Sequence, residues 1–270
     1  MIKLIDPLEG HENTLDLKQI VAEVFQEGGS LHKILDFEHR PQQEQMAHAV
    51  LKSIDSGEHL IFEAGTGVGK SLAYMIPAIL QAKYSNRPCI VATNTINLQE
   101  QLLHKDIPSV QKLFSQSIDL QTFEDFRCAL LVGRANYLCT TRLRKALLGQ
   151  SELFESRERK ELQRIAEWAD GVAKEGIRQE LSPPPLSTVW DAINADSSMC
   201  SNKRCNSDHC FYRKARAQVE KAHIIIVNHS LLFSLLGAGV SPSNDADGVI
   251  FPNDFIIFDE CSIPILTASG

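Results

Sequence analysis

Short apolar runs alternate with amphipathic stretches along most of the chain, and this alternation sets the first expectations about the fold. The apolar runs "EHLIFEA", "CIVATN", "CALLV", "HIIIVN" and "FIIFDE" have the length of buried strands. Helical patterns follow several of these runs, and further helices are predicted over residues 14–27 and after "RPQQEQM". Strands that alternate with helices predict an α/β fold, with a parallel sheet and helices on both faces.

This alternation breaks between about residues 140 and 221. Charged helical sequence, a proline-rich link ("LSPPPLS") and a cysteine cluster occupy the interval, and strand-like sequence resumes at "HIIIVN". The simplest organisation is one sheet domain with a long insertion. We therefore expect an N-terminal helical extension over residues 1–37, a sheet domain formed by residues 38–138 and 222–270, and an insertion over residues 139–221.

Composition narrows the class of protein. The chain has 270 residues, 43% of them hydrophobic and 23% charged, which is ordinary for a globular protein. Neither a signal peptide nor an apolar stretch long enough to span a bilayer is recognisable, so we expect a cytoplasmic protein without a membrane partner. In that reducing compartment the seven cysteines are expected to be thiols or metal ligands rather than disulfides.

The net charge of −7 argues against a broadly basic nucleic-acid binder, but the charge is unevenly distributed. Residues 200–221 hold six Lys or Arg and two Asp or Glu. A basic segment of this kind suits a local contact with a phosphate backbone. A solvated helix face explains the same charges equally well.

The segment "AGTGVGKS" predicts a phosphate-binding loop between a strand and a helix. Its backbone N–H groups and the following helix N-terminus would face phosphate oxygens. Lys70 would reach the β- and γ-phosphates, and the Ser71 hydroxyl would bind Mg²⁺. Ala64 stands where the strict pattern has glycine, and the competing interpretation is a glycine-rich turn with a chance Lys-Ser. The predicted nucleotide-contacting residues are Ala64, Gly65, Thr66, Gly67, Val68, Gly69, Lys70 and Ser71.

The apolar run "FIIF" ends in Asp259 and Glu260. Two acids after a strand are a weak signal alone, because many strands end that way. Together with the phosphate loop they predict catalysis of nucleotide hydrolysis. Asp259 would hold Mg²⁺, and Glu260 would orient and deprotonate the attacking water.

At this point several ordered motifs resemble those of one family. They are "RPQQEQM", "EAGTGVGKSLAYMIP", "VATNTINLQEQLLHKDIP", "GRANYLC" and "AHIIIVNHSLLF". Together they resemble the superfamily 2 iron-sulfur DNA helicases of the DinG/XPD type, over about residues 38–260. The resemblance implies that Gln43 reads adenine, with Arg40 nearby. It also implies a RecA-like fold, ATP-driven 5′-to-3′ unwinding, DNA with single-stranded regions as partner, and a second RecA-like motor domain.

The chain departs from the family pattern at several positions. Val132 stands where the family usually has Lys, and Asn94 stands where His is common. The family motif Asp-Glu-Ala-His is here Asp259, Glu260, Cys261 and Ser262. That histidine couples the ATP state to DNA contacts in the family.

Cys139, Cys200, Cys205 and Cys210 follow the pattern C-x60-C-x4-C-x4-C. The spacing alone leaves an iron-sulfur cluster, a zinc ion and unligated thiols open. The resemblance implies that the four thiolates hold a 4Fe-4S cluster. Cys89 and Cys128 lie in apolar strands and are expected to be packed core thiols.

The insertion also carries candidate DNA contacts. We expect backbone contacts from the basic residues Lys203, Arg204, Arg213, Lys214 and Arg216. Aromatic rings stack on unpaired bases in many single-strand binders, and the candidates here are Tyr137, Phe211 and Tyr212. The alternative is that these rings have a purely structural role and pack beside the metal site.

The tail "CSIPILTASG" departs from the family where its motif should continue. We therefore expect a truncated first motor domain that binds nucleotide but cannot unwind DNA by itself. Loss of the arginine finger of a second domain would slow hydrolysis by about 10³–10⁵. Two other functions stay open: an iron-sulfur module that binds single-stranded DNA with a vestigial ATP site, and a P-loop NTPase with a zinc-stabilised insert.

Overall fold

The computed structural model describes residues 15–65, 67–149, 156–196, 198, 200, 209–237 and 255–260. The chain forms two compact units. The first, here the helical unit, comprises Met1–Ser85 and Asp106–Asp125. The second, here the sheet unit, comprises Asn86–Lys105 and Phe126–Gly270.

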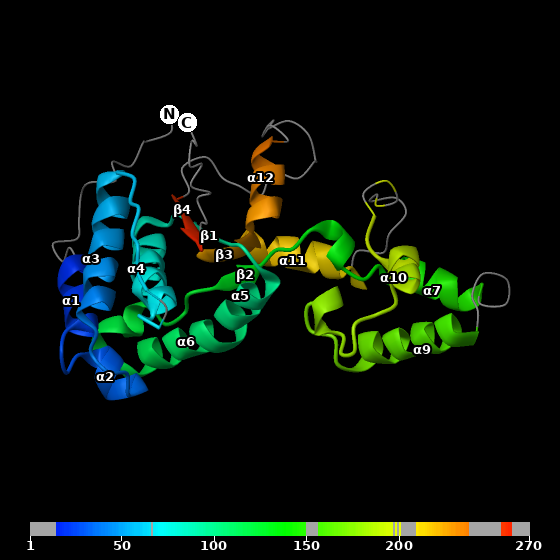
Figure 1. The fold of residues 1–270 in the computed structure, drawn as a ribbon, viewed down its shortest axis with the longest axis horizontal. Coiled ribbons are helices and arrows are strands. Elements are labelled where there is room, and N and C mark those ends of the chain that lie inside the picture. Colours follow the sequence, from blue (N-terminus) through cyan, green and yellow to red (C-terminus); the bar gives the residue numbers. More distant parts are fainter. Residues whose placement is uncertain are drawn as a thin grey trace, which may run out of the picture. The chain divides into compact units, whose positions relative to one another are not determined.

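The helical unit is built around one buried helix, and its described residues contain no strand. Its elements are α1 (Leu17–Phe25), α2 (Ser30–Leu35), α3 (Pro41–Ser56), α4 (Lys70–Ser85), α6 (Ile107–Gln116) and the 3₁₀ turn η2 (Ile118–Phe123). A π-helical turn, η1 (Leu102–Asp106), precedes α6. Residues 72–80 of α4 are all buried, and α3 packs along this helix (Figure 1). A helix that is apolar around its whole circumference needs such a central position.

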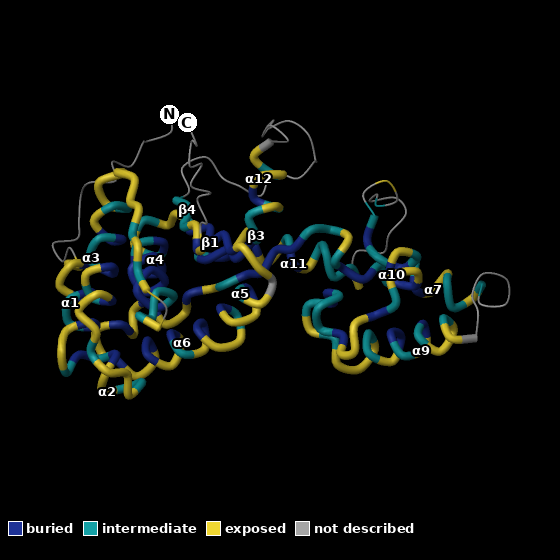
Figure 2. The backbone as a smooth tube through the Cα atoms, viewed as in Figure 1, coloured by how far each residue is buried: buried dark blue, intermediate teal, exposed yellow. Residues whose placement is uncertain are grey.

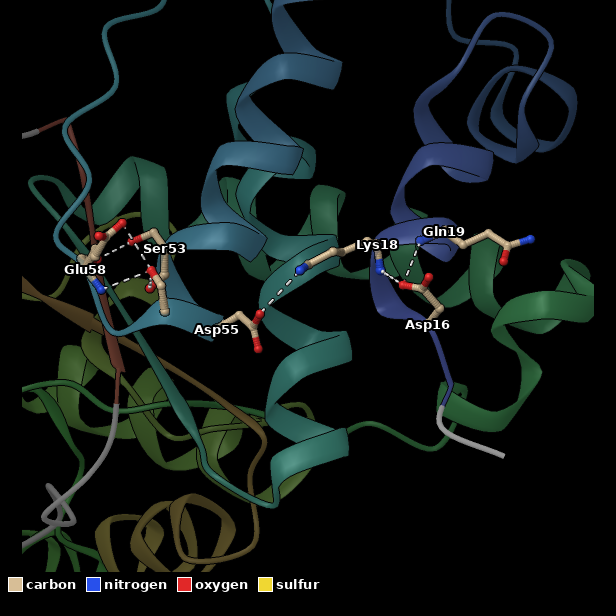
Figure 3. A network of polar contacts seen from close by, with 7 residues as sticks. Asp16, Lys18, Gln19, Ser53, Asp55 and Glu58 are labelled. Carbon is tan, nitrogen blue, oxygen red and sulfur yellow. Dashed lines mark hydrogen bonds and ion pairs between the residues drawn. The ribbon is translucent and has the colours of Figure 1, made fainter. Parts of the chain in front are cut away.

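The helices predicted at the start of the chain are confirmed, with sharper boundaries. The Asp16 carboxylate accepts a hydrogen bond from the backbone N–H of Lys18 at 2.9 Å and so caps α1 (Figure 3). Lys18 also forms an ion pair with Asp55 of α3, but both side chains are exposed, so it contributes little. At the end of α3, the Ser53 hydroxyl donates to the carbonyl of Glu58, which ties the following segment to this helix (Figure 3).

The prediction of a strand over "EHLIFEA" is wrong. Residues 58–65 form no regular element, and the Ile61 side chain is 87% exposed. A strand requires a neighbour for its backbone N–H and C=O groups, and the described sheet strands pair with one another. The apolar pattern shows that a segment suits a strand, but it does not supply the neighbour.

The sheet unit contains a four-stranded sheet in the order β2-β3-β1-β4 among the described residues. Its strands are β1 (Cys89–Thr93), β2 (Cys128–Leu130), β3 (Ile224–Asn228) and β4 (Phe255–Asp259). All three pairings are parallel, so the carboxyl ends of the strands lie at one edge. The predicted parallel α/β architecture is confirmed and is consistent with a RecA-like fold.

Helices follow or connect these strands. They are α5 (Ile96–Gln101), α7 (Thr140–Leu148), α9 (Ser156–Gly171), α10 (Ser187–Ile193), α11 (Phe211–Val219) and α12 (His229–Gly237), with the 3₁₀ turns η3 (Arg134–Asn136) and η4 (Arg178–Glu180). Strands β1 and β3 are almost entirely buried (Figure 2). One apolar cluster joins Ile90 and Ile225 of these strands to Val219 of α11 and Leu232 of α12.

A second apolar core lies mainly in residues 139–221, the segment predicted as an insertion and here called the insert. It gathers side chains of α7, α9 and α10 around Trp190, whose indole N–H donates to the carbonyl of Ala135 at 2.9 Å. Glu161 and Arg164 of α9 brace the proline-rich link, because Arg164 donates to the carbonyl of Pro183 at 3.0 Å and Glu161 accepts from the backbone N–H of Leu186. The predicted boundaries of the insertion at residues 139 and 221 stay a prediction.

None of the described helices combines the length and the apolar character that crossing a membrane requires.

Candidate nucleotide site and cysteine insert

The phosphate loop lies in the helical unit and ends where α4 begins. Gly67 and Gly69 have φ values of +81° and +85°, a left-handed conformation that L side chains rarely adopt. Lys70 is the first residue of the 16-residue α4, and Ser71 follows half-buried. The helix N-terminus therefore directs its dipole toward the loop, an arrangement that favours anions. Thr66, predicted as part of this loop, lies outside the described residues.

Two side chains from the start of α3 hold the loop by its backbone. The guanidinium of Arg40, at the N-cap of α3, donates to the carbonyl of Gly67. The buried side-chain amide of Gln43 donates to the carbonyl of Gly69 at 3.0 Å. The resemblance implies that Gln43 reads adenine, with Arg40 nearby, and this stays a prediction. In the structure both side chains contact the backbone of the loop and so help to position it.

Lys70 also contacts the loop. Its ammonium donates to the carbonyl of Ala64 at 3.3 Å, across the loop from its own position. The carbonyl of Gly69 accepts from the backbone N–H of Ala73 at 3.2 Å, which closes the first turn of α4. The loop thus combines backbone donors, a helix N-terminus and one ammonium group. This donor set suits the oxygens of a polyphosphate.

The two predicted acids lie in the sheet unit, at the carboxyl end of β4. Asp259 is buried, with 8% of its surface exposed, and is aligned with Thr93 at the end of β1. Glu260 is exposed and has a φ of +56°, a left-handed conformation that is uncommon for a residue other than glycine. Such strained positions are concentrated at functional sites. Two carboxylates with different solvent exposure therefore follow one another at this edge.

His229 is a polar residue of the same edge that the sequence analysis did not select. It opens α12, directly after β3, and its Nε2 lies 3.0 Å from the carbonyl oxygen of Ala92 in β1. Its ring packs on Phe258, the residue before Asp259, with ring centroids 5.7 Å apart. A histidine directly after a buried strand was the available signal, but its contacts with β1 and β4 depend on the strand order.

Two cysteines of the predicted metal site occupy helix starts in the insert. Cys139 is the N-cap of α7 and Cys210 is the N-cap of α11. The Thr140 hydroxyl donates to the carbonyl of His209 at 3.1 Å, which links the two helix starts. Both cysteines are half-buried and form no disulfide, and Cys200 is also half-buried.

The chemistry of this set fits an iron-sulfur cluster, since Fe-S clusters are held by Cys thiolates. Its geometry is incomplete in the part of the chain that the structure describes. Within that part, no group of three or more His, Cys, Asp or Glu side chains is arranged to hold a metal. Cys205, the fourth predicted ligand, lies outside the described residues, as do Lys203 and Arg204.

Of the two alternatives for Tyr137, the structure supports a packed ring and not a ring that stacks on bases. Its ring is 1% exposed, its hydroxyl accepts a hydrogen bond from the backbone N–H of Val132, and burial raises the pKa of Tyr137. Its ring packs edge-on against Tyr212. The guanidinium of Arg134 lies 4.5 Å from the centroid of the Tyr212 ring and so covers one of its faces. Phe211 is the remaining aromatic candidate, and it lines a cavity between α7, α9 and α11.

The two core thiols differ from the predicted metal ligands. Cys89 is fully buried in β1. Cys128 opens β2, and burial raises the pKa of its thiol to about 12. The burial of Cys89 confirms the prediction of a packed core thiol, whereas Cys128 lies half-buried at the start of β2.

Comparison with known proteins gives a consistent assignment. Residues 40–144 match the family model of the DEAD/DEAH box helicases. The ATP-dependent helicase DinG of Mycobacterium tuberculosis (strain ATCC 25618 / H37Rv) is 33% identical over 207 residues, which cover 72% of this chain and 30% of that protein. The ATP-dependent DNA helicase YoaA of Haemophilus influenzae is 31% identical over 249 residues, 91% of this chain and 36% of that protein. YoaA of Escherichia coli is 32% identical over 239 residues.

The chain thus spans about a third of the length of the curated relatives it matches. The family model covers the phosphate loop, and the YoaA similarity extends over most of the chain. The chain carries a DEAD/DEAH box helicase domain, and most of it is similar to part of the ATP-dependent helicases DinG and YoaA.

Proposed function

We propose that this chain is the nucleotide-binding part of an ATP-dependent DNA helicase, binding Mg-ATP at its phosphate loop and single-stranded DNA at its cysteine insert. The observation that carries this proposal is the loop at the start of α4. Its glycines adopt left-handed backbone, its carbonyls are held by Arg40 and Gln43, and Lys70 opens a long helix.

In this proposal the chain's own residues have separate roles. Lys70 and the backbone N–H groups of the loop bind the phosphates, and Gln43 and Arg40 keep the loop in position. Ser71 and Asp259 supply oxygen ligands for Mg²⁺, which would neutralise charge on the phosphates. Glu260 orients and deprotonates the attacking water. The roles of Ser71, Asp259 and Glu260 rest on the sequence pattern of the family.

Nucleotide binding is tested first by titration of a fluorescent ATP analogue with and without Mg²⁺. The proposal predicts that the chain binds the analogue in a Mg²⁺-dependent way and that Lys70→Ala abolishes this binding. Asp259→Asn should make the binding less dependent on Mg²⁺. Lys52→Ala, a change of an exposed lysine on α3, serves as a matched control and should bind as the unmodified chain does. Equal binding by the Lys70→Ala and Lys52→Ala chains would refute the proposed phosphate site.

For the insert we propose a 4Fe-4S cluster held by Cys139, Cys200, Cys205 and Cys210. When bound, such a cluster would cross-link the starts of α7 and α11 through its thiolate ligands. The support is the thiolate donor set, the half-buried positions of Cys139 and Cys210, and the helix starts joined by Thr140 and His209.

Metal analysis of the anaerobically purified chain tests this assignment. The proposal predicts iron and acid-labile sulfide, with visible absorbance that Cys139→Ser removes and Cys89→Ser retains. Cys89 is a suitable control because it is buried in β1. Zinc without sulfide, or iron retained in Cys139→Ser at the full level, would overturn the cluster assignment.

The relatives are named as ATP-dependent helicases. For this chain the proposal covers the binding and hydrolysis of nucleotide and the binding of DNA. The 5′-to-3′ direction that the resemblance implies stays a prediction. Arg213, Lys214 and Arg216 of α11 are the described residues proposed to contact the DNA backbone. Positive side chains that neutralise phosphates make affinity fall with salt concentration.

A further inference from the structure

A hydrogen bond between His39 and Glu44 spans the start of α3. The Nε2 atom of His39 lies 2.8 Å from Oε2 of Glu44, and the two side chains are half-buried, with 25% and 30% of their surface exposed. An ionised carboxylate only accepts hydrogen bonds, so Nε2 carries the hydrogen and donates it. A contact at this depth is screened less by solvent than one between exposed side chains. It encloses residues 40–43, the segment from which both side chains reach the phosphate loop.

The cap of α3 shows what this contact does for the helix. Arg40 occupies the N-cap and makes no side-chain capping hydrogen bond, since a guanidinium has donors but no acceptor. In many helices an apolar contact between the residue before the N-cap and the fourth helical residue fixes the direction in which the chain enters. His39 and Glu44 occupy these two positions, so a hydrogen bond takes the place of the apolar contact. Glu44 is also an acid in the first turn, where the helix dipole favours negative charge.

Arg40 is the residue whose direction this contact fixes. Its side chain is exposed, and its guanidinium donates to the carbonyl of Gly67 in the phosphate loop. A long exposed side chain has many rotamers to lose, so one hydrogen bond holds it more easily when its backbone is already fixed. Gln43, by contrast, is buried and holds the loop from a packed position. Loss of the contact between His39 and Glu44 should therefore act on the loop through Arg40.

We propose that His39 and Glu44 are positioning residues of the nucleotide site: their hydrogen bond fixes the direction in which Arg40 leaves α3, and Arg40 in turn holds Gly67. This inference rests on the proposed binding of nucleotide and deepens it, because it adds two residues that act through Arg40 rather than on the phosphates. The predicted effect is on the affinity for nucleotide, and it disappears when the Arg40 side chain is absent.

The experiment measures affinity for a fluorescent ATP analogue with Mg²⁺ in two backgrounds, the unmodified chain and the Arg40→Ala chain. His39→Ala should lower the affinity of the unmodified chain about fivefold, the order expected for loss of one hydrogen bond. In the Arg40→Ala chain the same change should have no further effect, because the side chain that it positions is gone. His39→Gln should retain affinity, since the amide of glutamine can donate to Glu44. His48→Ala changes another half-buried histidine of α3 and is the matched control, with the affinity of the unmodified chain.

Glu44→Ala tests the contact from the other partner. Its matched control is Gln45→Ala, which changes the next residue of α3, an exposed one. Glu44→Ala should lower affinity as much as His39→Ala does, and the double variant should lose no more than either single variant. Thermal melting of each chain without nucleotide shows that the compared chains are folded.

Three outcomes are decisive. Affinity of the His39→Ala and Glu44→Ala chains equal to that of the unmodified chain would overturn the inference and leave the phosphate site intact. Equal losses from His39→Ala in both backgrounds would also overturn it, since a residue that only stabilises the fold lowers affinity whether or not the Arg40 side chain is present. Failure of the unmodified chain to bind the analogue would instead refute the proposed nucleotide site.

Discussion

The side-chain amide of Gln43 donates a hydrogen bond to the carbonyl of Gly69, the last residue before α4, at 3.0 Å. Gln43 is buried, and a Cβ added at Gly69 would collide with its amide group. Two features therefore favour glycine at position 69: the left-handed backbone, and the close approach of the Gln43 amide. This pair couples the first turn of α3 to the phosphate loop.

Gly69→Ala is expected to lower affinity for a fluorescent ATP analogue at least tenfold, because the Gln43 amide or the loop must shift and their hydrogen bond is lost. Gly57→Ala is a matched control, since Gly57 has a φ of +71° but no atom within 4 Å of an added Cβ. Both changes should cost about 1–2 kcal/mol of stability from the left-handed backbone. Only Gly69→Ala should also impair nucleotide binding, and equal binding by the two chains would contradict the role of this contact.

Removing the glutamine side chain tests the same contact from the other partner. Gln43→Ala alone should weaken nucleotide binding, because the loop loses a hydrogen bond from a buried donor. In the double variant with Gly69→Ala, part of the loss should be recovered, because the collision is removed. Strictly additive losses in the double-mutant cycle would show that the two residues do not act on each other.

The ion pair between Glu161 and Arg164 should make the stability of the insert depend on pH. The hydrogen bond from the Arg164 guanidinium, 2.7 Å to Oε1, holds the pKa of Glu161 below its usual value. A lowered pKa in the folded state contributes stability above the unfolded pKa, about 4.3, and this stability is lost as the pH falls through the folded value. Glu161→Gln should therefore destabilise the insert at pH 7, by about 0.5–1.5 kcal/mol, and this difference should vanish in acid.

Tryptophan fluorescence reports this transition, because both tryptophans of the chain, Trp168 and Trp190, belong to the core of the insert. Glu167→Gln on the same helix is the control, since its described partner is the nearby Gln163 of the same helix. A Glu161→Gln chain whose stability stays below that of the unmodified chain by the same amount at every pH would contradict the assignment.

Cys128 should react slowly with alkylating reagents in the folded chain. The thiolate is the reactive species, and a pKa of about 12 leaves very little of it at neutral pH. Mass spectrometry of the peptide that contains Cys128 should show labelling that increases strongly when the chain is unfolded. Labelling at similar rates in the native and unfolded chains would contradict the raised pKa of this thiol.

Local apolar pattern was sufficient to predict the four strands of the sheet, because a buried parallel strand is apolar on both faces. The same pattern failed at residues 58–64, where Leu60 and Ile61 are exposed and unpaired in the described sheet. Strand formation there depends on a neighbour that the segment itself does not encode.

In the candidate site, too, some features follow from local sequence and others depend on the fold. The glycine spacing around Lys70 predicted the loop, because the required backbone conformation is local. The contact of His229 with the carbonyl of Ala92 was not predictable, since it arises only when β3 lies beside β1. The cavity beside Phe211 likewise depends on the packing of three helices from distant parts of the sequence.

The most direct measurement of the central claim is Mg-ATP hydrolysis by the anaerobically purified chain, with and without single-stranded DNA. Lys70→Ala is the reference for loss of the phosphate site, and Lys52→Ala is the control for an exposed lysine. The account predicts Mg²⁺-dependent turnover that single-stranded DNA increases, that Lys70→Ala abolishes and that Lys52→Ala retains. Two results would contradict the account. One is a turnover of the Lys70→Ala chain equal to that of the unmodified chain, and the other is no turnover by the unmodified chain with Mg²⁺ and DNA.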